Sequence, residues 1–427
     1  MSLNTTPRGQ RLHIALFGRR NTGKSSLINA LTNQEVAIVS GIPGTTTDPV
    51  SKAMELLPLG PVMLIDTAGL DDTGELGALR VQKTLAVLNK TDLALLVVDP
   101  GQEAGEVESS LIALARKQKT PLIGVLNKID LFPEADPLAW QKELGIPLIA
   151  VSARTHQGID GLKMTIVRSA PKDWTLPTIL GDLISPGDLV VLVVPLDKAA
   201  PKGRLILPQQ QVIRDILEND AVAVTVKERE LGHALAGLAK KPRLVVTDAS
   251  AYAPAAAATP ADVPFTSFSI LFARYKGDLI ALAAGAKAVR DLRPGDKILI
   301  AEACTHHPVQ DDIGRVKIPR WLCQAVGGEL TFDVVSGGGA LPENLREYRL
   351  VVHCGACMLN RREMLYRIMQ AQEAGTPIVN YGVLLASLHG VLKRALSPFP
   401  QALAVFAGEP NEPGEEPPRA ANAAEIR

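Results

Sequence analysis

The stretch His13-Ile-Ala-Leu-Phe17-Gly18-Arg-Arg-Asn-Thr-Gly23-Lys24-Ser25 decides the fold of the first part of this chain. Its first five residues form an apolar run typical of a buried strand, and a helical pattern follows the serine. The spacing in between matches a glycine-rich phosphate-binding loop. The glycines let backbone N–H groups close around phosphates, and the helix N-terminus adds partial positive charge. The stretch therefore predicts a strand, a nucleotide-binding loop and a helix in succession.

The side chains of this loop have distinct expected roles. Lys24 would reach the β- and γ-phosphates, and the Ser25 hydroxyl would bind Mg²⁺. The other loop residues expected to contact the nucleotide are Gly18, Asn21, Thr22, Gly23 and Ser26.

Two further segments carry the pattern of a GTPase switch. Gly44-Thr-Thr-Thr-Asp48 offers Thr46 for Mg²⁺ and the γ-phosphate. Asp66-Thr-Ala-Gly69 ends a strand, so Asp66 would hold Mg²⁺ through water and the Gly69 N–H would sense the γ-phosphate. The expected catalytic residues are Lys24, Asn21, Thr46 and Gly69, and the expected Mg²⁺ ligands are Ser25, Thr46 and Asp66.

The base specificity follows from two later segments. Asn127-Lys-Ile-Asp130 follows a strand, and the Asp130 carboxylate can accept hydrogen bonds from the N1–H and N2–H₂ groups of guanine, which adenine does not offer. Ser152-Ala-Arg154 would place a backbone N–H at guanine O6. The residues expected to bind the base are Asn127, Lys128, Asp130, Ser152 and Ala153. The ligand is therefore GTP rather than ATP.

These motifs resemble the translation-factor-like GTPases of the tRNA-modification and Era-like group, over residues 11–170. Leu70 stands where Ras-like proteins carry a water-positioning glutamine, and an apolar side chain cannot orient water. Asn21 matches an asparagine that ligates K⁺ in cation-activated relatives. We therefore expect slow hydrolysis in which K⁺ supplies the charge of an arginine finger. The alternative is that Asn21 only braces the loop.

Apolar runs at residues 13–17, 62–65, 93–98, 122–126 and 148–151 are expected to be buried strands. They alternate with helical patterns and predict an α/β fold with a doubly wound parallel sheet. Two smaller α/β units should follow. A run of alanines and prolines, 251–264, is expected to be either a linker or a short helix, and 383–395 a single helix. The expected domains are a flexible N-terminus (1–10), a GTPase domain (11–172), a middle unit (173–264), a third unit (265–408) and a disordered tail (409–427).

Composition limits the classes of function. Lys plus Arg and Asp plus Glu both total 45, which argues against a broad basic surface for nucleic acid or anionic lipid. No apolar run approaches the length of a membrane span, and no apolar signal core opens the chain. Only four cysteines occur, which fits a reducing cytoplasm.

Three of those cysteines lie in a metal-ligand pattern. Cys304-Thr-His306 and His353-Cys354-Gly-Ala-Cys357 are separated by residues 307–352. Thiolate and imidazole groups at such spacing suit an iron–sulfur cluster or zinc. Both halves follow predicted strands, and ligands collect at the carboxyl ends of strands in open α/β sheets. Three thiolates could hold three irons of a [4Fe–4S] cube. His306 or His353 could be the fourth ligand, or could instead contact one of the ligands without binding iron.

Other interpretations of this pattern remain open. A structural Cys₃His zinc site is chemically sound, and cysteines that only pack are a further alternative. A redox-active Cys-x-x-Cys pair would leave Cys304 and His306 without a role. Cys323 lies outside the pattern and is expected to be a buried apolar residue.

The combined pattern, Cys-x-His followed by His-Cys-x-x-Cys behind a GTPase domain of the potassium-dependent type, resembles the HydF family of scaffold GTPases in [FeFe]-hydrogenase maturation. The resemblance covers residues 11–408. It implies that Cys304, Cys354 and Cys357 bind a [4Fe–4S] cluster, that the middle unit makes a homodimer, and that a 2Fe precursor is carried to apo-[FeFe]-hydrogenase. It also implies two radical S-adenosylmethionine enzymes as partners. A tRNA-modification GTPase is the rival from another class.

Overall fold

The computed structural model describes residues 8–32, 51–67, 84–171, 178–195, 205–303, 312–338, 340–356 and 359–408. The chain divides into two units. The first comprises Met1–Pro177, Gly338–Ala340 and Met358–Arg367, and the second comprises Thr178–Gly337, Leu341–Cys357 and Ile368–Arg427. Of the helices in the part that is described, none is long and apolar enough to cross a membrane.

A six-stranded sheet forms the centre of the first unit, in the order β2-β3-β1-β4-β5-β6. Its strands are β1 (Leu12–Phe17), β2 (Ser51–Leu56), β3 (Gly60–Asp66), β4 (Leu93–Val98), β5 (Leu122–Leu126) and β6 (Leu148–Ala150). Five of these six strands were predicted from their apolar runs. The sixth, β2, was not, because polar residues interrupt it and it pairs antiparallel with β3 at the edge of the sheet.

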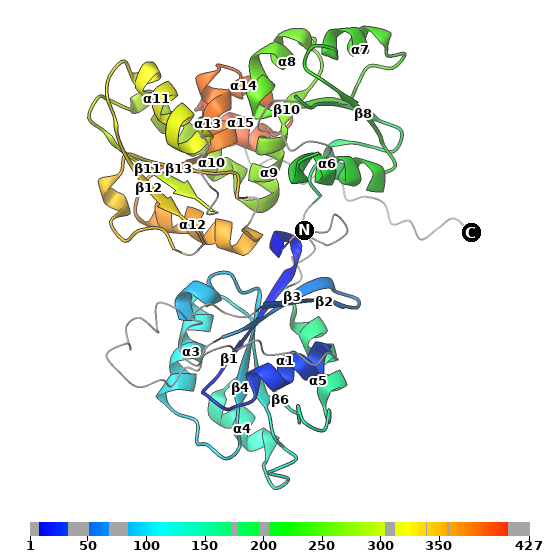
Figure 1. The fold of residues 1–427 in the computed structure, drawn as a ribbon, viewed down its shortest axis with the longest axis vertical. Coiled ribbons are helices and arrows are strands. Elements are labelled where there is room, and N and C mark those ends of the chain that lie inside the picture. The colour runs from blue at the N-terminus through cyan, green and yellow to red at the C-terminus, as the bar shows by residue number, and fades with distance from the viewer. Residues whose placement is uncertain are drawn as a thin grey trace. The chain divides into compact units, whose positions relative to one another are not determined.

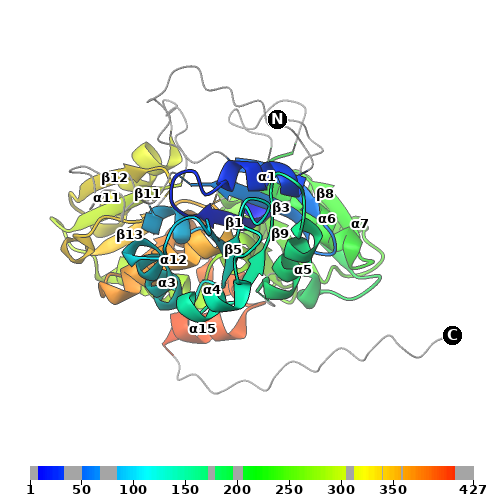
Figure 2. The ribbon, with the colours of Figure 1, turned by 90° about the horizontal axis from the view of Figure 1, so that it is seen from below.

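Helices cover both faces of this sheet. Helices α1 (Lys24–Thr32) and α5 (Ile159–Ser169) pack on one face, and α3 (Glu106–Lys117) and α4 (Pro137–Leu144) pack on the other (Figures 1 and 2). Each face buries its own apolar cluster, because alternate residues of β1 point to opposite sides of the sheet. A short 3-10 helix, Arg8–Gln10, precedes β1. The doubly wound fold expected from the sequence is confirmed.

The second unit contains two four-stranded parallel sheets. The first has the order β10-β9-β7-β8 and consists of β7 (Leu189–Val193), β8 (Val222–Val226), β9 (Leu244–Thr247) and β10 (Phe265–Ser267). Its helices are α6 (Leu207–Glu218), α7 (Leu231–Gly237) and α8 (Tyr252–Ala258). Within the run 251–264, helix α8 settles the choice between a linker and a helix in favour of the helix. The pairing of β10 with β9 extends this sheet beyond residue 264.

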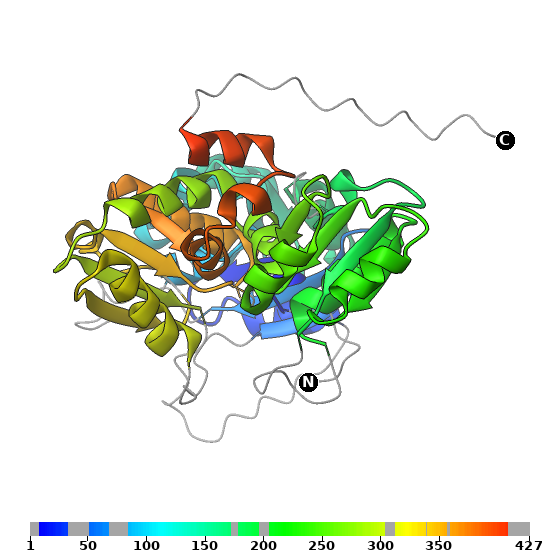
Figure 3. The same cartoon turned by 90° about the horizontal axis from the view of Figure 1, so that it is seen from above.

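The other sheet of the second unit has the order β12-β11-β13-β14. Figure 3 shows this part of the chain in yellow to orange. Its strands are β11 (Lys297–Glu302), β12 (Thr331–Ser336), β13 (Leu350–His353) and β14 (Ile378–Asn380). The helices that lie in this part of the second unit are α9 (Phe268–Lys276), α10 (Leu279–Ala288), α11 (Ile318–Val326), α13 (Tyr381–Leu388), α14 (Leu392–Ala395) and α15 (Pro400–Ala407). Helix α12 (Arg361–Glu373) belongs to the first unit up to Arg367 and to the second unit from Ile368. A π-helical turn, Ile313–Lys317, leads into α11.

Two details of this region differ from the sequence prediction. The single helix expected over residues 383–395 is wrong, because the chain leaves α13 and turns through Gly390 in a left-handed conformation (φ 68°) before α14 begins. Strand β12 was not predicted, because its burial pattern mixes exposed and half-buried residues without a buried face.

Candidate nucleotide and metal sites

The loop after β1 lines a pocket of about 480 Å³ at the carboxyl edge of the first sheet. Two of its glycines are required by close packing. A Cβ atom at Gly18 would lie 2.3 Å from the carbonyl oxygen of Val97, and one at Gly23 would lie 2.3 Å from Nδ2 of Asn127. Both glycines also have positive φ angles (149° and 89°). A larger residue at either position would force the loop out of its phosphate-binding shape.

The loop holds its own charged groups in defined positions. Lys24 is buried, and its Nζ donates hydrogen bonds to the carbonyl oxygens of Gly18 (3.0 Å) and Arg19 (2.7 Å). Arg19 in turn forms a two-pronged salt bridge with Glu108 of α3, with both nitrogen–oxygen distances at 2.8 Å. Asn21 lines the pocket with a left-handed backbone (φ 61°). These contacts place the lysine ammonium inside the curve of the loop.

Ser25 and Asp66 meet at the mouth of this pocket. The serine Oγ lies 2.5 Å from Asp66 Oδ2, and within the described residues Asp66 Oδ1 is buried with no hydrogen-bond partner. Burial raises the pKa of Asp66, against the hydrogen bond from Ser25 and the charge of Lys24, which lower it. A desolvated carboxylate beside a hydroxyl fits a divalent cation, which would supply the missing positive charge. Of the expected catalytic residues, Thr46 and Gly69 lie outside the described residues.

The segment after β5 connects the phosphate loop to the base-binding edge. Asn127 is buried; its Nδ2 donates to the Thr22 carbonyl oxygen (2.9 Å), and its Oδ1 accepts from the Ala153 N–H (3.0 Å). Asp130 Oδ1 accepts from the Ser152 hydroxyl at 2.7 Å. Asn127 therefore links three motifs that are far apart in the sequence. From the sequence Asn127 was predicted only to bind the base, and its contacts with the phosphate loop and with Ala153 were not predicted.

Lys128 lies in the same pocket and is anchored from the side. Its Nζ forms a salt bridge with Asp99, which follows β4, at 2.6 Å, and its backbone is left-handed (φ 65°). The aliphatic part of its side chain is thus held in place beside the base-binding edge. The described members of the nucleotide motifs therefore gather at the carboxyl ends of β1, β3, β5 and β6.

The strands that precede the two halves of the cysteine motif, β11 and β13, are neighbours in one sheet. Ala301 and His353 are register partners, and the Cys354 N–H donates to the Ala301 carbonyl oxygen at 2.9 Å. The Cys354 Sγ accepts a hydrogen bond from the Ala303 N–H at 3.1 Å. Ala303 directly precedes Cys304, which lies outside the described residues, so the convergence of the two halves stays a prediction.

The remaining members of the motif are described only in part. Cys304, His306 and Cys357 lie outside the described residues, and among those described there is no group of three or more His, Cys, Asp or Glu side chains placed to hold a metal ion. His353 is fully buried, and its Nδ1 donates to the Cys354 carbonyl oxygen at 2.8 Å. That bond requires a proton on Nδ1. Cys323, expected to be buried, is half-buried in α11.

Two residues near Cys354, Glu302 and Tyr381, were not predicted from the sequence. Glu302, at the end of β11, is buried, and its Oε2 accepts from Arg315 (2.7 Å) and from Ser336 (3.0 Å). Its Oε1 and the Tyr381 hydroxyl are both buried and, within the described residues, have no hydrogen-bond partner. Both oxygens pack against Gly314, because a Cβ atom at that position would lie 3.0 Å from the Glu302 oxygen and 2.1 Å from the Tyr381 oxygen.

Electrostatics keep the Tyr381 hydroxyl protonated. Burial raises its pKa, and the negative charges of Cys354, Glu302 and Asp312 raise it further. The tyrosine is therefore a hydrogen-bond donor at neutral pH. Buried polar atoms without partners, next to a thiol that accepts a backbone N–H, fit a site that takes up an additional polar group. The donor chemistry suits either an iron–sulfur cluster or zinc.

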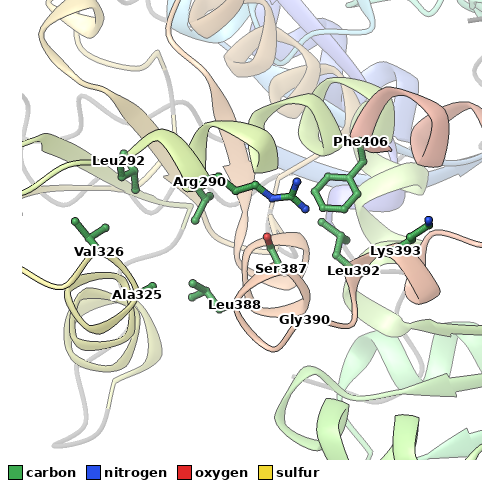
Figure 4. A pocket seen from close by; sticks show the side chains of 11 residues that line it. Arg290, Leu292, Ala325, Val326, Ser387, Leu388, Gly390, Leu392, Lys393 and Phe406 are labelled. Carbon is green, nitrogen blue, oxygen red and sulfur yellow. The ribbon is translucent and has the colours of Figure 1, made fainter. Parts of the chain in front are cut away.

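The second unit also contains a pocket of about 470 Å³, shown in Figure 4, whose lining differs from that of the nucleotide pocket. Arg290 lies over the ring of Phe406, with its guanidinium carbon 4.8 Å from the ring centroid. Lys393 and several apolar side chains complete the lining. Neither cysteine nor carboxylate is among the described residues that line it, so it offers no typical metal ligand.

The fold and the nucleotide site define a P-loop GTPase. The family model described as a 50S ribosome-binding GTPase matches residues 13–128. The chain is 42% identical over 158 residues to a tRNA modification GTPase of Chromobacterium violaceum, covering 36% of this chain and 34% of that protein. It is 40% identical over 161 residues to the corresponding protein of Symbiobacterium thermophilum, covering 37% and 35%. The chain thus spans about a third of the length of these curated relatives.

The rest of the chain identifies the family. Models of the hydrogen maturase F dimerization and tetramerization domains match residues 179–277 and 280–398. The chain belongs to the hydrogen maturase F family, HydF, and carries oligomerisation domains. Among solved structures, the G domain of the T. maritima FeoB iron transporter is 30% identical and covers 37% of this chain and 98% of that one, with a TM-score of 0.30.

Proposed function

We propose that this protein is a GTP-hydrolysing scaffold that binds a [4Fe–4S] cluster and a 2Fe precursor and delivers the precursor to apo-[FeFe]-hydrogenase. The observation that carries the proposal is the bond from the Ala303 N–H to the Cys354 Sγ. It joins Cys354 to Ala303, the residue before Cys304, in a chain of the hydrogen maturase F family, and this supports a site that both segments share. The tRNA modification GTPases match this chain in the GTPase part alone.

In this proposal Cys304, Cys354 and Cys357 bind the cluster. His306 or His353 is either the fourth ligand or a residue that contacts a ligand without binding iron. A backbone N–H to a ligating sulfur and small residues between the cysteines are both typical of cluster sites. When bound, the cluster would supply an iron whose remaining position can exchange, so that a precursor can dock through a bridging ligand. The Tyr381 hydroxyl and Glu302 Oε1 would offer a donor and an acceptor beside it.

The GTPase domain would act as a switch for partner exchange. GTP and Mg²⁺, held by Lys24, Ser25 and Asp66, would bias a conformational equilibrium and would not drive chemistry at the cluster. K⁺ near Asn21 would assist a slow hydrolysis. The proposed partners are apo-[FeFe]-hydrogenase, two radical S-adenosylmethionine maturation enzymes and a second copy of the chain. We propose that this exchange takes place in the cytoplasm.

The first test is anaerobic purification followed by iron and sulfide analysis and EPR spectroscopy after dithionite reduction. We expect about four irons and four sulfides per chain, as a [4Fe–4S] cluster requires. The EPR signal should be lost in a Cys304→Ser variant. One zinc per chain without an EPR signal would overturn the proposal in favour of a structural zinc site. A second test adds the cluster-bearing protein to apo-hydrogenase, which should gain activity only with protein expressed alongside the partner enzymes.

A further inference from the structure

A buried carboxylate links helix α3 to the phosphate-binding loop of the first unit. Glu108 lies in the first turn of α3 and is only 3% exposed. Its Oε1 accepts a hydrogen bond from Arg19 Nε and its Oε2 accepts one from Arg19 Nη2, both at 2.8 Å. Oε2 also accepts from the backbone N–H of Gly105 at 2.9 Å. One carboxylate therefore bonds both to the start of its own helix and to a loop far away in the sequence.

The stability of α3 does not by itself explain this arrangement. A carboxylate in the first turn of a helix gains from the helix dipole while it stays in water, and Glu106 in the same turn is exposed in this way. Glu108 is instead buried, which costs free energy unless the charge is paired. Capping of the helix requires only the bond to Gly105, so the two bonds to Arg19 serve the loop.

The backbone of Arg19 contacts the lysine that is expected to bind the phosphates. The Arg19 carbonyl oxygen accepts hydrogen bonds from Lys24 Nζ at 2.7 Å and from the Thr22 hydroxyl at 3.0 Å. The arginine is thus held by Glu108 through its side chain, and it holds Lys24 through its backbone. A two-pronged pair of guanidinium and carboxylate fixes the relative orientation of both groups. The pair therefore restrains the residue from which Lys24 is positioned.

We propose that Glu108 is a positioning residue for GTP hydrolysis, which holds the phosphate-binding loop through Arg19 and so sets where Lys24 meets the β- and γ-phosphates. Glu108 is not among the described residues that line the nucleotide pocket, so its effect passes through the loop. Displacement of a catalytic group by about 1 Å can cost roughly a hundredfold in rate. The inference rests on the GTP hydrolysis in the proposed function and does not involve the cluster.

The test is a double-mutant cycle with the full-length protein. Two quantities are measured, the single-turnover rate of GTP hydrolysis with protein in excess and the dissociation constant of a fluorescent GTP analogue. Glu108→Gln keeps the size of the side chain and one acceptor but removes the charge. Glu106→Gln, in the same turn of α3, is the matched control. Both substitutions are also made in a Lys24→Met background, which lacks the ammonium group.

We expect Glu108→Gln to lower the rate roughly tenfold, as for a modest displacement of Lys24, and to weaken nucleotide binding. Glu106→Gln should leave both quantities unchanged. In the Lys24→Met background Glu108→Gln should have no further effect, because two residues that act through one group are not additive. The affinity cycle decides the point where Lys24→Met leaves no hydrolysis to measure.

The outcomes separate this inference from the proposed function. Unmodified protein that does not hydrolyse GTP contradicts the proposed function itself. A lower unfolding temperature of Glu108→Gln with unchanged rate and affinity would overturn the positioning role, since Glu108 would then only stabilise α3. An equal effect of Glu108→Gln with and without the Lys24 ammonium would overturn it as well.

A second variant covers the case in which Glu108→Gln does not fold. Arg19→Lys keeps the positive charge but cannot form the two-pronged contact with Glu108. It should lower the rate of hydrolysis in the presence of Lys24 and have no further effect in the Lys24→Met background. An unchanged rate in Arg19→Lys would contradict the proposal.

Discussion

The backbone N–H of Ala303 donates to the Cys354 Sγ across two neighbouring strands of one sheet. The pairing of β11 with β13 makes this bond possible, because Ala301 and His353 are register partners just before the strands end. A shift of the register by one residue would turn the Cys354 side chain to the other face of the sheet. The pairing of these two strands therefore determines where Cys354 lies relative to Ala303.

Replacement of Cys354 by serine should remove the cluster. Serine keeps the size of the side chain, but its hydroxyl is a poor ligand for iron compared with a thiolate. We expect the iron content of Cys354→Ser to fall several-fold and the EPR signal of the reduced protein to disappear. Cys323→Ser is the matched control, because this cysteine is half-buried in α11, outside the motif. Equal loss of iron in both variants would point to a general loss of folding.

Replacement of Asp130 by asparagine should weaken GTP binding roughly 10- to 100-fold, since a two-pronged contact with a base edge contributes about 1–3 kcal/mol to discrimination. The asparagine amide offers a donor to xanthine, whose O2 is an acceptor, so binding of xanthosine triphosphate should improve. Titration with fluorescent nucleotides measures both. Asp136→Asn, at the N-cap of α4, is the control that should leave nucleotide affinity unchanged. Unaltered base preference in Asp130→Asn would contradict the assignment.

The Asn21 side chain should be needed for activation by potassium. Asn21→Gly is the suitable variant, because glycine accepts the left-handed backbone of this position (φ 61°) without strain. We expect the unmodified protein to hydrolyse GTP at least roughly tenfold faster in K⁺ than in Na⁺. The reason is that K⁺ would stabilise the negative charge that develops in the transition state. The variant should show no preference. Equal rates in both salts for the unmodified protein would mean that Asn21 only braces the loop.

Binding of Mg²⁺ should depend on pH through Asp66. Burial raises the pKa of this carboxyl, so on acidification it takes up a proton at a higher pH than an ordinary aspartate does. The proton competes with the cation, and Mg²⁺ affinity should therefore fall as pH falls through the raised pKa. The same shift lowers the free energy of unfolding of the metal-free protein at pH values above the raised pKa, where Asp66 is ionised. Acidification protonates Asp66 and removes this loss of stability.

The measurement is the Mg²⁺ concentration for half-maximal GTP hydrolysis at a series of pH values. Asp66→Asn should bind Mg²⁺ more weakly at every pH and should lose this part of the pH dependence. If the dependence persists unchanged in the variant, it comes from the nucleotide phosphates.

Removal of the Tyr252 hydroxyl should destabilise the second unit. This side chain is 1% exposed, and its hydroxyl bonds to the Ser267 Oγ (2.6 Å) and the Gly382 carbonyl oxygen (3.1 Å). Tyr252→Phe leaves both partners buried without it, which should lower the free energy of unfolding by about 1–2 kcal/mol. Calorimetry would show this as a lower transition temperature. Tyr366→Phe, which alters a half-buried tyrosine, should change it less. No difference between the two variants would contradict the expectation.

Local patterns predicted most of the fold but not its irregular elements. Apolar runs such as Leu93–Val98 identify buried parallel strands, because both faces of such strands are covered. Apolar runs do not identify the strands Ser51–Leu56 and Thr331–Ser336, because these strands are only partly buried and therefore carry polar residues. Local patterns also fail at Gly390, where one helix becomes two, because a single glycine within a helical pattern is compatible with either outcome.

The sequence by itself determined which chemical groups are present and in what order. The spacing of Gly18, Gly23 and Lys24 and the cysteine pattern are local features, and the types of ligand follow from the residues alone. Only the tertiary structure decided which of these groups meet. Asn127 braces the phosphate loop, Ala303 donates to Cys354, and Glu108 holds Arg19 in a salt bridge. Each of these contacts joins segments far apart in the chain, so it depends on strand register and helix packing, which no local pattern encodes.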